Sequence, residues 1–169
     1  TLNIIEQALA DMQEGYVEVP NYKEMIIKGL DYCLLMAETD NIDKAFPNLK
    51  DQEKKSIYTL RLKTLVKKVR ELAAEQCDFN KCREIINEVL SINKSSLEFP
   101  NNVILAEFAE GLFDAVDTYT YIIWPQAVED FRKSMTNVFS GIGVVIKKNE
   151  EGYIEAESLI SYDAPSCEA

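Results

Sequence analysis

Along the first 138 residues, apolar side chains recur at the spacing of one face of a helix. In six segments the apolar positions lie three and four residues apart, a pattern that predicts amphipathic helices. Each apolar stripe needs a partner surface that covers it, so the sequence predicts a mainly α fold, a bundle of about six helices. In chain order the stripes run over Ile5–Met12, Ile26–Ala37, Ile57–Ala73, Cys82–Leu90, Leu105–Val116 and Val128–Val138.

Capping residues predict where these helices begin. Asn3 followed by Glu6, and Asn21 followed by Glu24, match the spacing of an N-cap with its capping box. Gly15 closes the first helix. The later helices are expected to begin at Asp51, at Phe79, after Pro100 and at Pro125.

Two glycines lie inside predicted helices. Gly29 in "YKEMIIKGLDYCL" and Gly111 in "ILAEFAEGLFDAV" each sit in a Gly-Leu pair on an apolar stripe. Glycine costs a helix about 1 kcal/mol relative to alanine, so a glycine retained there predicts a close helix contact. The similarity between these two segments is a single case and does not indicate a repeat architecture.

From Gly141 onward the apolar period changes from 3.6 to 2. Two alternating runs flank the charged turn "KNEEG" and predict a β-hairpin. A two-stranded ribbon is marginal alone in water, so we expect it to pack on the bundle, on another chain or on further sequence. The hairpin and the helix start in "DAPSCEA" together predict the first part of a small β-rich domain that continues beyond Ala169. The expected division is a helical domain over 1–138 and the start of this second domain over 139–169.

The charge balance limits the partners. With 29 acidic against 18 basic residues the net charge is -11, which disfavours binding to nucleic acid. Eight of the basic residues fall between Lys50 and Arg70, and the amphipathic pattern there favours the solvated face of a helix over a positive stripe. No apolar run is long enough to predict a membrane span.

The sequence offers little for catalysis. Histidine is absent, which removes the commonest general base. Ser91-Ile-Asn-Lys94 formally matches S-x-x-K, but it lies at a predicted helix end without the companion motifs. We therefore expect no catalytic residue and no cofactor in this chain.

The cysteines show no spacing typical of a disulfide framework. We expect buried thiols, while a Cys77–Cys82 pairing or a zinc site built from all four thiols are the weaker alternatives. The four are Cys33, Cys77, Cys82 and Cys167.

The Gly141-Ile142-Gly143 stretch admits two interpretations. It is not a dinucleotide fingerprint, because Ile146 stands where the third glycine is needed and a strand follows instead of a helix. A glycine turn that exposes consecutive N–H groups can hold a carboxylate, with the next strand pairing with a peptide. Alternatively, the glycines only allow tight packing at a strand entry.

"FSGIGVVI", the charged turn, "GYIEAESLI" and "DAPSCEA" together resemble the start of the PDZ domain in carboxyl-terminal processing (tail-specific) serine proteases. That family precedes the strand with a D-P-H-T/S-x-Y turn, a proline and a helix containing phenylalanine. This chain has Asp117-Thr118-Tyr119-Thr120, then Trp124-Pro125, then Glu129-Asp130-Phe131. Thr118 and Tyr119 stand in place of the family's proline and histidine.

The resemblance implies a site for the C-terminal tails of proteins or peptides. It implies a carboxylate-binding loop formed by Gly141, Ile142, Gly143 and Val144. It further implies a tail-pairing strand at Val145 and Ile146. The family's catalytic serine and lysine lie downstream and match nothing here. The chain is then expected to be a non-catalytic N-terminal part of a serine peptidase, a hydrolase acting in proteolysis outside the cytoplasm (periplasmic or exported).

In that interpretation the helices serve as a platform or oligomerisation region. The unpaired apolar strands predict self-association into a homo-oligomer. The alternative is a self-contained helical protein–protein interaction module without a protease link, whose hairpin caps the bundle or pairs with a partner's strand.

Overall fold

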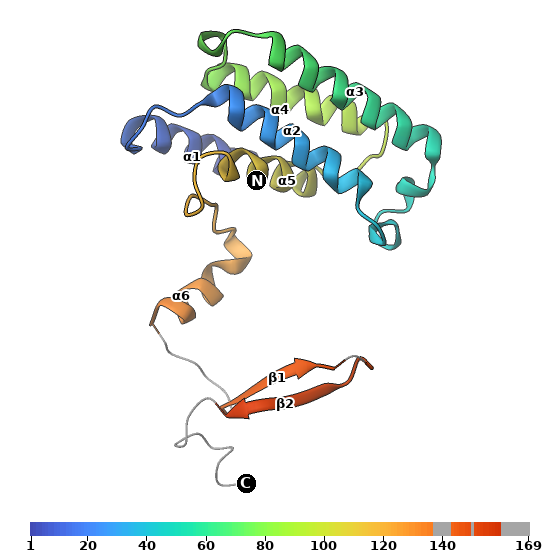
Figure 1. Cartoon of the computed structure of the whole chain (residues 1–169), viewed down its shortest axis with the longest axis vertical. Helices are drawn as coiled ribbons and strands as arrows, with labels where there is room; N and C mark the ends of the chain where they lie inside the picture. Colours follow the sequence, from blue (N-terminus) through green and yellow to red (C-terminus); the bar gives the residue numbers. More distant parts are fainter. Residues whose placement is uncertain (137–142, 150, 160–169) are drawn as a thin grey trace. The chain divides into compact units, whose positions relative to one another are not determined.

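A computed structural model describes residues 1–136, 143–149 and 151–159 of the chain. It is mainly helical and ends in an antiparallel β-hairpin, which confirms the predicted fold class (Figure 1). The chain divides into two compact units, residues 1–122 and 123–169, which are described separately below. The division at 138/139 expected from the sequence stays a prediction.

The first unit is a bundle of five α-helices joined by short connections that include 3-10 turns. Helix α2 packs most extensively against α5 and also contacts α3 and α4, and α1 covers the edge formed by α4 and α5 (Figure 1). The helices are α1 (Leu2–Gly15), α2 (Tyr22–Glu38), α3 (Gln52–Glu71), α4 (Phe79–Lys94) and α5 (Asn101–Asp114).

Side-chain caps fix the beginnings of three helices. The Asn21 side chain accepts a hydrogen bond from the Glu24 N–H over 3.2 Å, which confirms the predicted start of α2. Asp51 and Asp78 cap α3 and α4 in the same way. The prediction for α1 was wrong by a few residues: the helix begins at Leu2, before Asn3, and its N-cap residue makes no side-chain hydrogen bond.

Helix α3 buries only part of the predicted stripe: Leu65, Val66 and Val69 are buried as predicted, whereas Leu72 and Ala73 are not buried and follow the helix, which ends at Glu71. Tyr58 and Leu62 are fully buried and continue the core-facing line of Leu65, Val66 and Val69. The assignment of Ile57 and Leu60 to the core was wrong, since they are 39% and 68% exposed. At 100° per residue, Leu60 lies on the side of α3 opposite to the buried line.

Helices α2 and α5 touch through their backbones. A methyl group at Gly111 would lie 2.5 Å from the carbonyl oxygen of Lys28, and one at Gly29 would lie 2.8 Å from the carbonyl oxygen of Phe108. Each distance is shorter than van der Waals contact allows, so only glycine fits at either position. The prediction that these glycines mark a close helix contact is confirmed.

The connection between α4 and α5 is partly buried, although its sequence, "NKSSLEFPN", is mostly polar. Leu97 and Phe99 are 1% and 3% exposed, and the Phe99 ring packs edge-on against Phe46 and Tyr58. The buried Asn93 side chain donates to the Phe99 carbonyl over 2.8 Å and accepts from the Phe99 N–H over 2.9 Å. It thereby satisfies both main-chain groups of a residue that has no helical partner.

Three cysteines are buried free thiols, as predicted. Cys33, Cys77 and Cys82 form no disulfide, and Cys167 lies outside the described residues. Burial raises the pKa of the Cys82 thiol to about 12, and it raises the pKa of Cys33 as well. Both therefore stay protonated and behave as small apolar side chains.

The second unit contains η4 (Pro125–Ala127), α6 (Val128–Thr136), β1 (Val144–Lys148) and β2 (Ile154–Leu159). The predicted apolar stripe of α6 does not face a core: Val128 and Phe131 are both 37% exposed, and Met135 is 69% exposed. The described part of this unit has one short helix and two strands, too little apolar surface to form a covering layer. Val138, the last member of the stripe, lies outside the described residues.

We predict that Gly111→Ala lowers the free energy of unfolding by about 2 kcal/mol, measured by urea denaturation followed by circular dichroism. The added methyl group forces α2 and α5 apart, which outweighs the gain of about 1 kcal/mol in helix propensity. Gly15→Ala is the matched control, because no atom lies within 4 Å of the added methyl group. Equal stability of the Gly111→Ala variant and the wild type would contradict the backbone contact.

We expect Asn93→Ala to cost about 2–4 kcal/mol of unfolding free energy, because it leaves both buried main-chain groups of Phe99 without a partner. The same denaturation measurement tests this. Asn87→Ala, an exposed position on the same helix, should change stability by less than about 0.5 kcal/mol. Similar losses in the two variants would show that the Asn93 hydrogen bonds are unimportant.

Candidate peptide-binding strand

The hairpin is a two-stranded antiparallel sheet in which Val144 lies opposite Leu159 and Lys148 opposite Ile154. The turn is shaped by Asn149, whose side chain accepts from the Tyr153 N–H over 2.9 Å. Gly152 occupies the turn with φ of 91°, a conformation that favours glycine. The alternation of apolar residues in the sequence predicted both strands.

The two faces of the hairpin differ in polarity. Between Val145 and Ile146 the pairing is irregular, and Glu157 is the extra residue of a β-bulge in β2. The bulge keeps Leu159 on the same face as the apolar residues of β1. One face carries Val145, Lys147, Glu155 and Ser158, and the other, which is mostly apolar, carries Val144, Ile146, Lys148, Ile154, Ala156 and Leu159.

The apolar face is open to solvent. Ile146 is 63% exposed and Ile154 is 73% exposed. Apart from Val144, every described strand residue of the pair is exposed. Single exposed apolar residues are ordinary, but a row of them across two paired strands is typical of a surface that binds another chain.

The outer edge of β1 has free main-chain groups. The Asn149 N–H donates to the Tyr153 carbonyl over 2.9 Å, so these residues form a hydrogen-bonded pair at the turn. Such pairs alternate along an antiparallel ladder, which places the main-chain groups of Ile146 and Lys148 on the outer edge. No strand covers that edge within the described residues.

The structure places four of the six site residues predicted by the resemblance. Gly143 immediately precedes β1 and has a φ of 81°. Val144, Val145 and Ile146 form the first part of β1. Gly141 and Ile142 lie outside the described residues, so the carboxylate-binding role of the glycine loop stays a prediction.

The Asp117-Thr118-Tyr119-Thr120 turn, singled out by the resemblance, has a structural role in the first unit. Asp117 accepts hydrogen bonds from the Tyr119 and Thr120 N–H groups and from the Thr120 hydroxyl. It also accepts one from the Tyr16 hydroxyl, at the end of α1. These bonds fasten the segment after α5 to α1. They lower the pKa of Asp117 to about 2, with the Tyr16 hydrogen bond as the largest cause.

The S-x-x-K match does not form a serine–lysine pair in the structure. Ser91 and Lys94 are both exposed at the end of α4, and no hydrogen bond joins their side chains. Within the same part of the chain, no group of three or more cysteine, aspartate or glutamate side chains is arranged to hold a metal ion. Among the described helices, none is both long and apolar enough to cross a bilayer.

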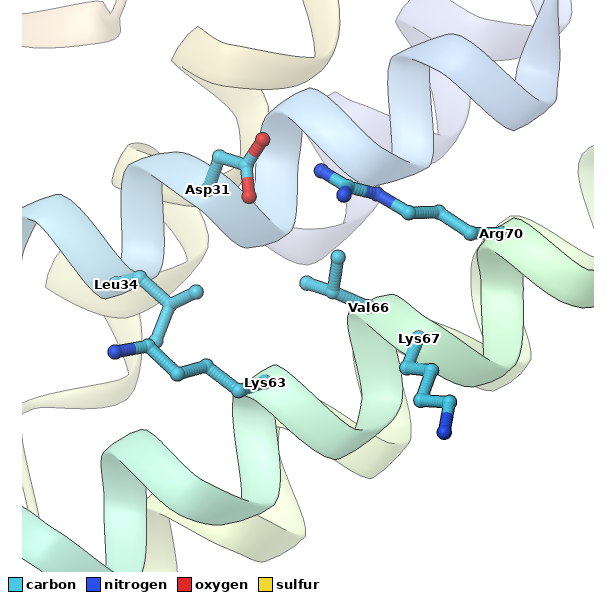
Figure 2. A pocket seen from close by; sticks show the side chains of 6 residues that line it. All are labelled: Asp31, Leu34, Lys63, Val66, Lys67 and Arg70. Atoms are coloured by element: carbon cyan, nitrogen blue, oxygen red, sulfur yellow. The ribbon is translucent and has the colours of Figure 1, made fainter.

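A second surface feature was not predicted from the sequence. A groove between α2 and α3 is lined by Lys63, Lys67, Arg70 and Asp31 (Figure 2). The run of basic residues between Lys50 and Arg70 was the signal for it. Most of that run does lie on a solvated face: Lys50, Lys54, Lys63 and Lys68 pair with carboxylates, and Arg61 donates to Ser95.

Comparisons with models of known protein families, with curated proteins and with solved structures each find no match to this chain. The fold therefore defines only a structural class, a helical bundle followed by a β-hairpin whose β1 edge is uncovered within the described residues.

We predict that the Asp117 carboxyl titrates near pH 2, observed through its carboxyl carbon by NMR. Tyr16→Phe should raise this pKa toward the ordinary value of about 3.9. Because the folded pKa is the lower one, the stabilisation is complete above pH of about 4 and is lost as the pH falls toward 2. Tyr32→Phe, which removes a hydrogen bond to Asp114 instead, should leave the Asp117 titration unchanged.

Proposed function

We propose that the chain is a protein-binding module in which the outer edge of β1 takes up an extended segment of another protein by β-strand addition. The observation that carries the proposal is the uncovered outer edge of β1 at Ile146 and Lys148, in a strand that begins directly after Gly143. An incoming strand gains main-chain hydrogen bonds at such an edge, whatever its sequence.

The apolar face of the hairpin supplies the selectivity. Alternate side chains of an added strand would extend the row formed by Ile146, Ile154 and their neighbours. Apolar residues at every second position of the partner are therefore favoured. Lys147 and Glu155 on the opposite face favour polar residues at the positions between them.

The resemblance to the tail-specific proteases makes this proposal more specific about the bound segment and about the protein to which the chain belongs. In this more specific form the bound segment is a C-terminal tail whose carboxylate meets the glycine turn. The chain is then a non-catalytic part of a serine peptidase, and its helical unit is a platform or oligomerisation region. The alternative is an interaction module with no protease link, which would bind an internal strand equally well.

The test uses a short fluorescein-labelled peptide that alternates threonine with valine and ends in a free carboxylate. Binding is measured by fluorescence anisotropy, and amide exchange by NMR. We expect the Ile146 and Lys148 amides to become protected when the peptide is added, whereas the Lys147 amide, already bonded to β2, changes little. Absence of binding, or protection elsewhere in the chain, would refute strand addition at β1.

Matched variants at Lys148 test the edge itself. Lys148→Pro removes one outward N–H group and should weaken binding about fivefold or more, while Lys148→Ala keeps that group and should bind as the wild type does. A peptide with an amidated C-terminus separates the two forms of the proposal. Weaker binding of the amide supports capture of a tail, and equal binding supports the module without a protease link.

Self-association is measured alongside by light scattering after size-exclusion chromatography. The free edge of β1 predicts that the chain dimerises at high concentration and that the peptide competes with dimer formation. A monomer at every concentration would count against self-association through this edge.

A further inference from the structure

The groove between α2 and α3 is long and open. The two helices run antiparallel: Asp31 near the middle of α2 lines the same stretch as Arg70 at the end of α3, and Glu38 at the end of α2 lines the same stretch as Gln52 at the start of α3 (Figure 1). The groove consists of two neighbouring stretches, of about 310 and 410 Å³, and Lys63 lines both of them. Its walls are Asp31, Leu34 and Glu38 from α2, and residues at three- and four-residue spacing from Gln52 to Arg70 on α3.

The dimensions of the groove fit a helix. At a rise of 1.5 Å per residue, the lining of α3 from Gln52 to Arg70 is about 27 Å long, or about five turns. Both walls are ridges of helical side chains, and the groove between two such ridges accepts the ridge of a third helix. An extended strand would gain no main-chain hydrogen bonds here, because the backbone groups of both walls are used within the helices.

The charge of the groove is opposite to that of the chain. The lining contains four cations, Lys55, Lys63, Lys67 and Arg70, and two carboxylates, in a chain with a net charge of -11. Lys63 forms an exposed ion pair with Glu38 over 3.5 Å. No ion pair engages Lys67 or Arg70 in the described part of the chain. In Figure 2, Arg70 extends from α3 toward α2, while Lys67 points away from it.

Apolar side chains lie between these charges. Leu34 and Val66 form the floor and are nearly buried, at 9% and 7% exposure. Leu60 lies at the edge of the groove and is 68% exposed, although its spacing predicted a core position. Its position beside the cations is what an apolar anchor for a partner would require.

We propose that this groove binds an acidic amphipathic helix from a partner protein. Apolar residues of that helix cover Leu60 and the floor, and its carboxylates pair with Lys63, Lys67 and Arg70. A nucleic acid fits less well, because the net charge of -11 on the chain repels a long polyanion, whereas a short acidic helix contacts only the groove. This surface and the β1 edge use different residues, so either proposal can fail without the other.

The test uses a labelled synthetic helix of about 18 residues, the length that matches the groove, with leucine at every third or fourth position and glutamate on both flanks. Affinity for the full chain is measured by fluorescence anisotropy at low and at physiological salt. We expect binding that weakens as salt increases, and no binding of the same peptide with lysine in place of each glutamate.

Two charge-reversal variants form a matched pair. Lys67→Glu with Arg70→Glu should weaken binding of the acidic helix about tenfold or more. Lys44→Glu with Lys94→Glu makes the same change in net charge at exposed positions outside the groove, and should leave the affinity within about twofold. Circular dichroism verifies that both variants are folded.

Three results would overturn the proposal. One is equal loss of affinity in the two variants. Another is tighter binding of a single-stranded DNA oligomer than of the acidic helix, because the groove would then be a polyanion site. The third is self-association that disappears in the groove variant alone, because a second copy of this chain would then be the occupant.

Discussion

The helical unit depends on the backbone contact between α2 and α5. At Gly29 and Gly111 the two helices approach so closely that main-chain atoms of one lie against main-chain atoms of the other. This contact fixes the relative position of the helices, because neither can rotate or slide without a collision. It also places Asp114 beside Lys28 and Tyr32, which pair with it over 2.9 and 3.1 Å. On its next face, α2 then holds α3 at the spacing that leaves the basic groove.

The parts of the fold that follow from local rules were readable in the sequence. Apolar spacing predicted the helices, the side chain of Asn21 predicted the start of α2, and the glycines predicted a close contact. The stripe of α3 was misjudged because Tyr58, a residue of intermediate polarity, takes the core position and turns Leu60 outward. The buried corner between α4 and α5 could not be predicted either. Its stability comes from Asn93 satisfying a backbone six residues away, and no local pattern signals such a bond.

Of the two candidate sites, the hairpin follows from a local sequence rule and the groove does not. The change to a period of two predicted the hairpin and the part of its apolar face before the bulge, because alternation alone assigns side chains to the faces of a strand. Beyond the bulge, Leu159 takes the place on this face that the alternation gave to Ser158. The bulge at Glu157 was not predicted, since one inserted residue leaves the composition of the strand unchanged. The groove could not be predicted from the sequence, because it joins residues of α2 with residues of α3 that lie about thirty positions later in the chain. Which helices are neighbours is a tertiary property, and the run of basic residues shows only one of the two walls.

The bulge makes the two edges of the hairpin unequal. Along β1 the groups that face outward from Ile146 to Lys148 are regularly spaced, whereas β2 is interrupted at Glu157 and carries an acidic residue there. Irregular and charged edges are poor templates for further strands. Under the proposed strand addition, another chain would pair with β1 but not with β2, which favours pairs of chains over fibres. In that proposal the bulge would limit polymerisation to a single added strand.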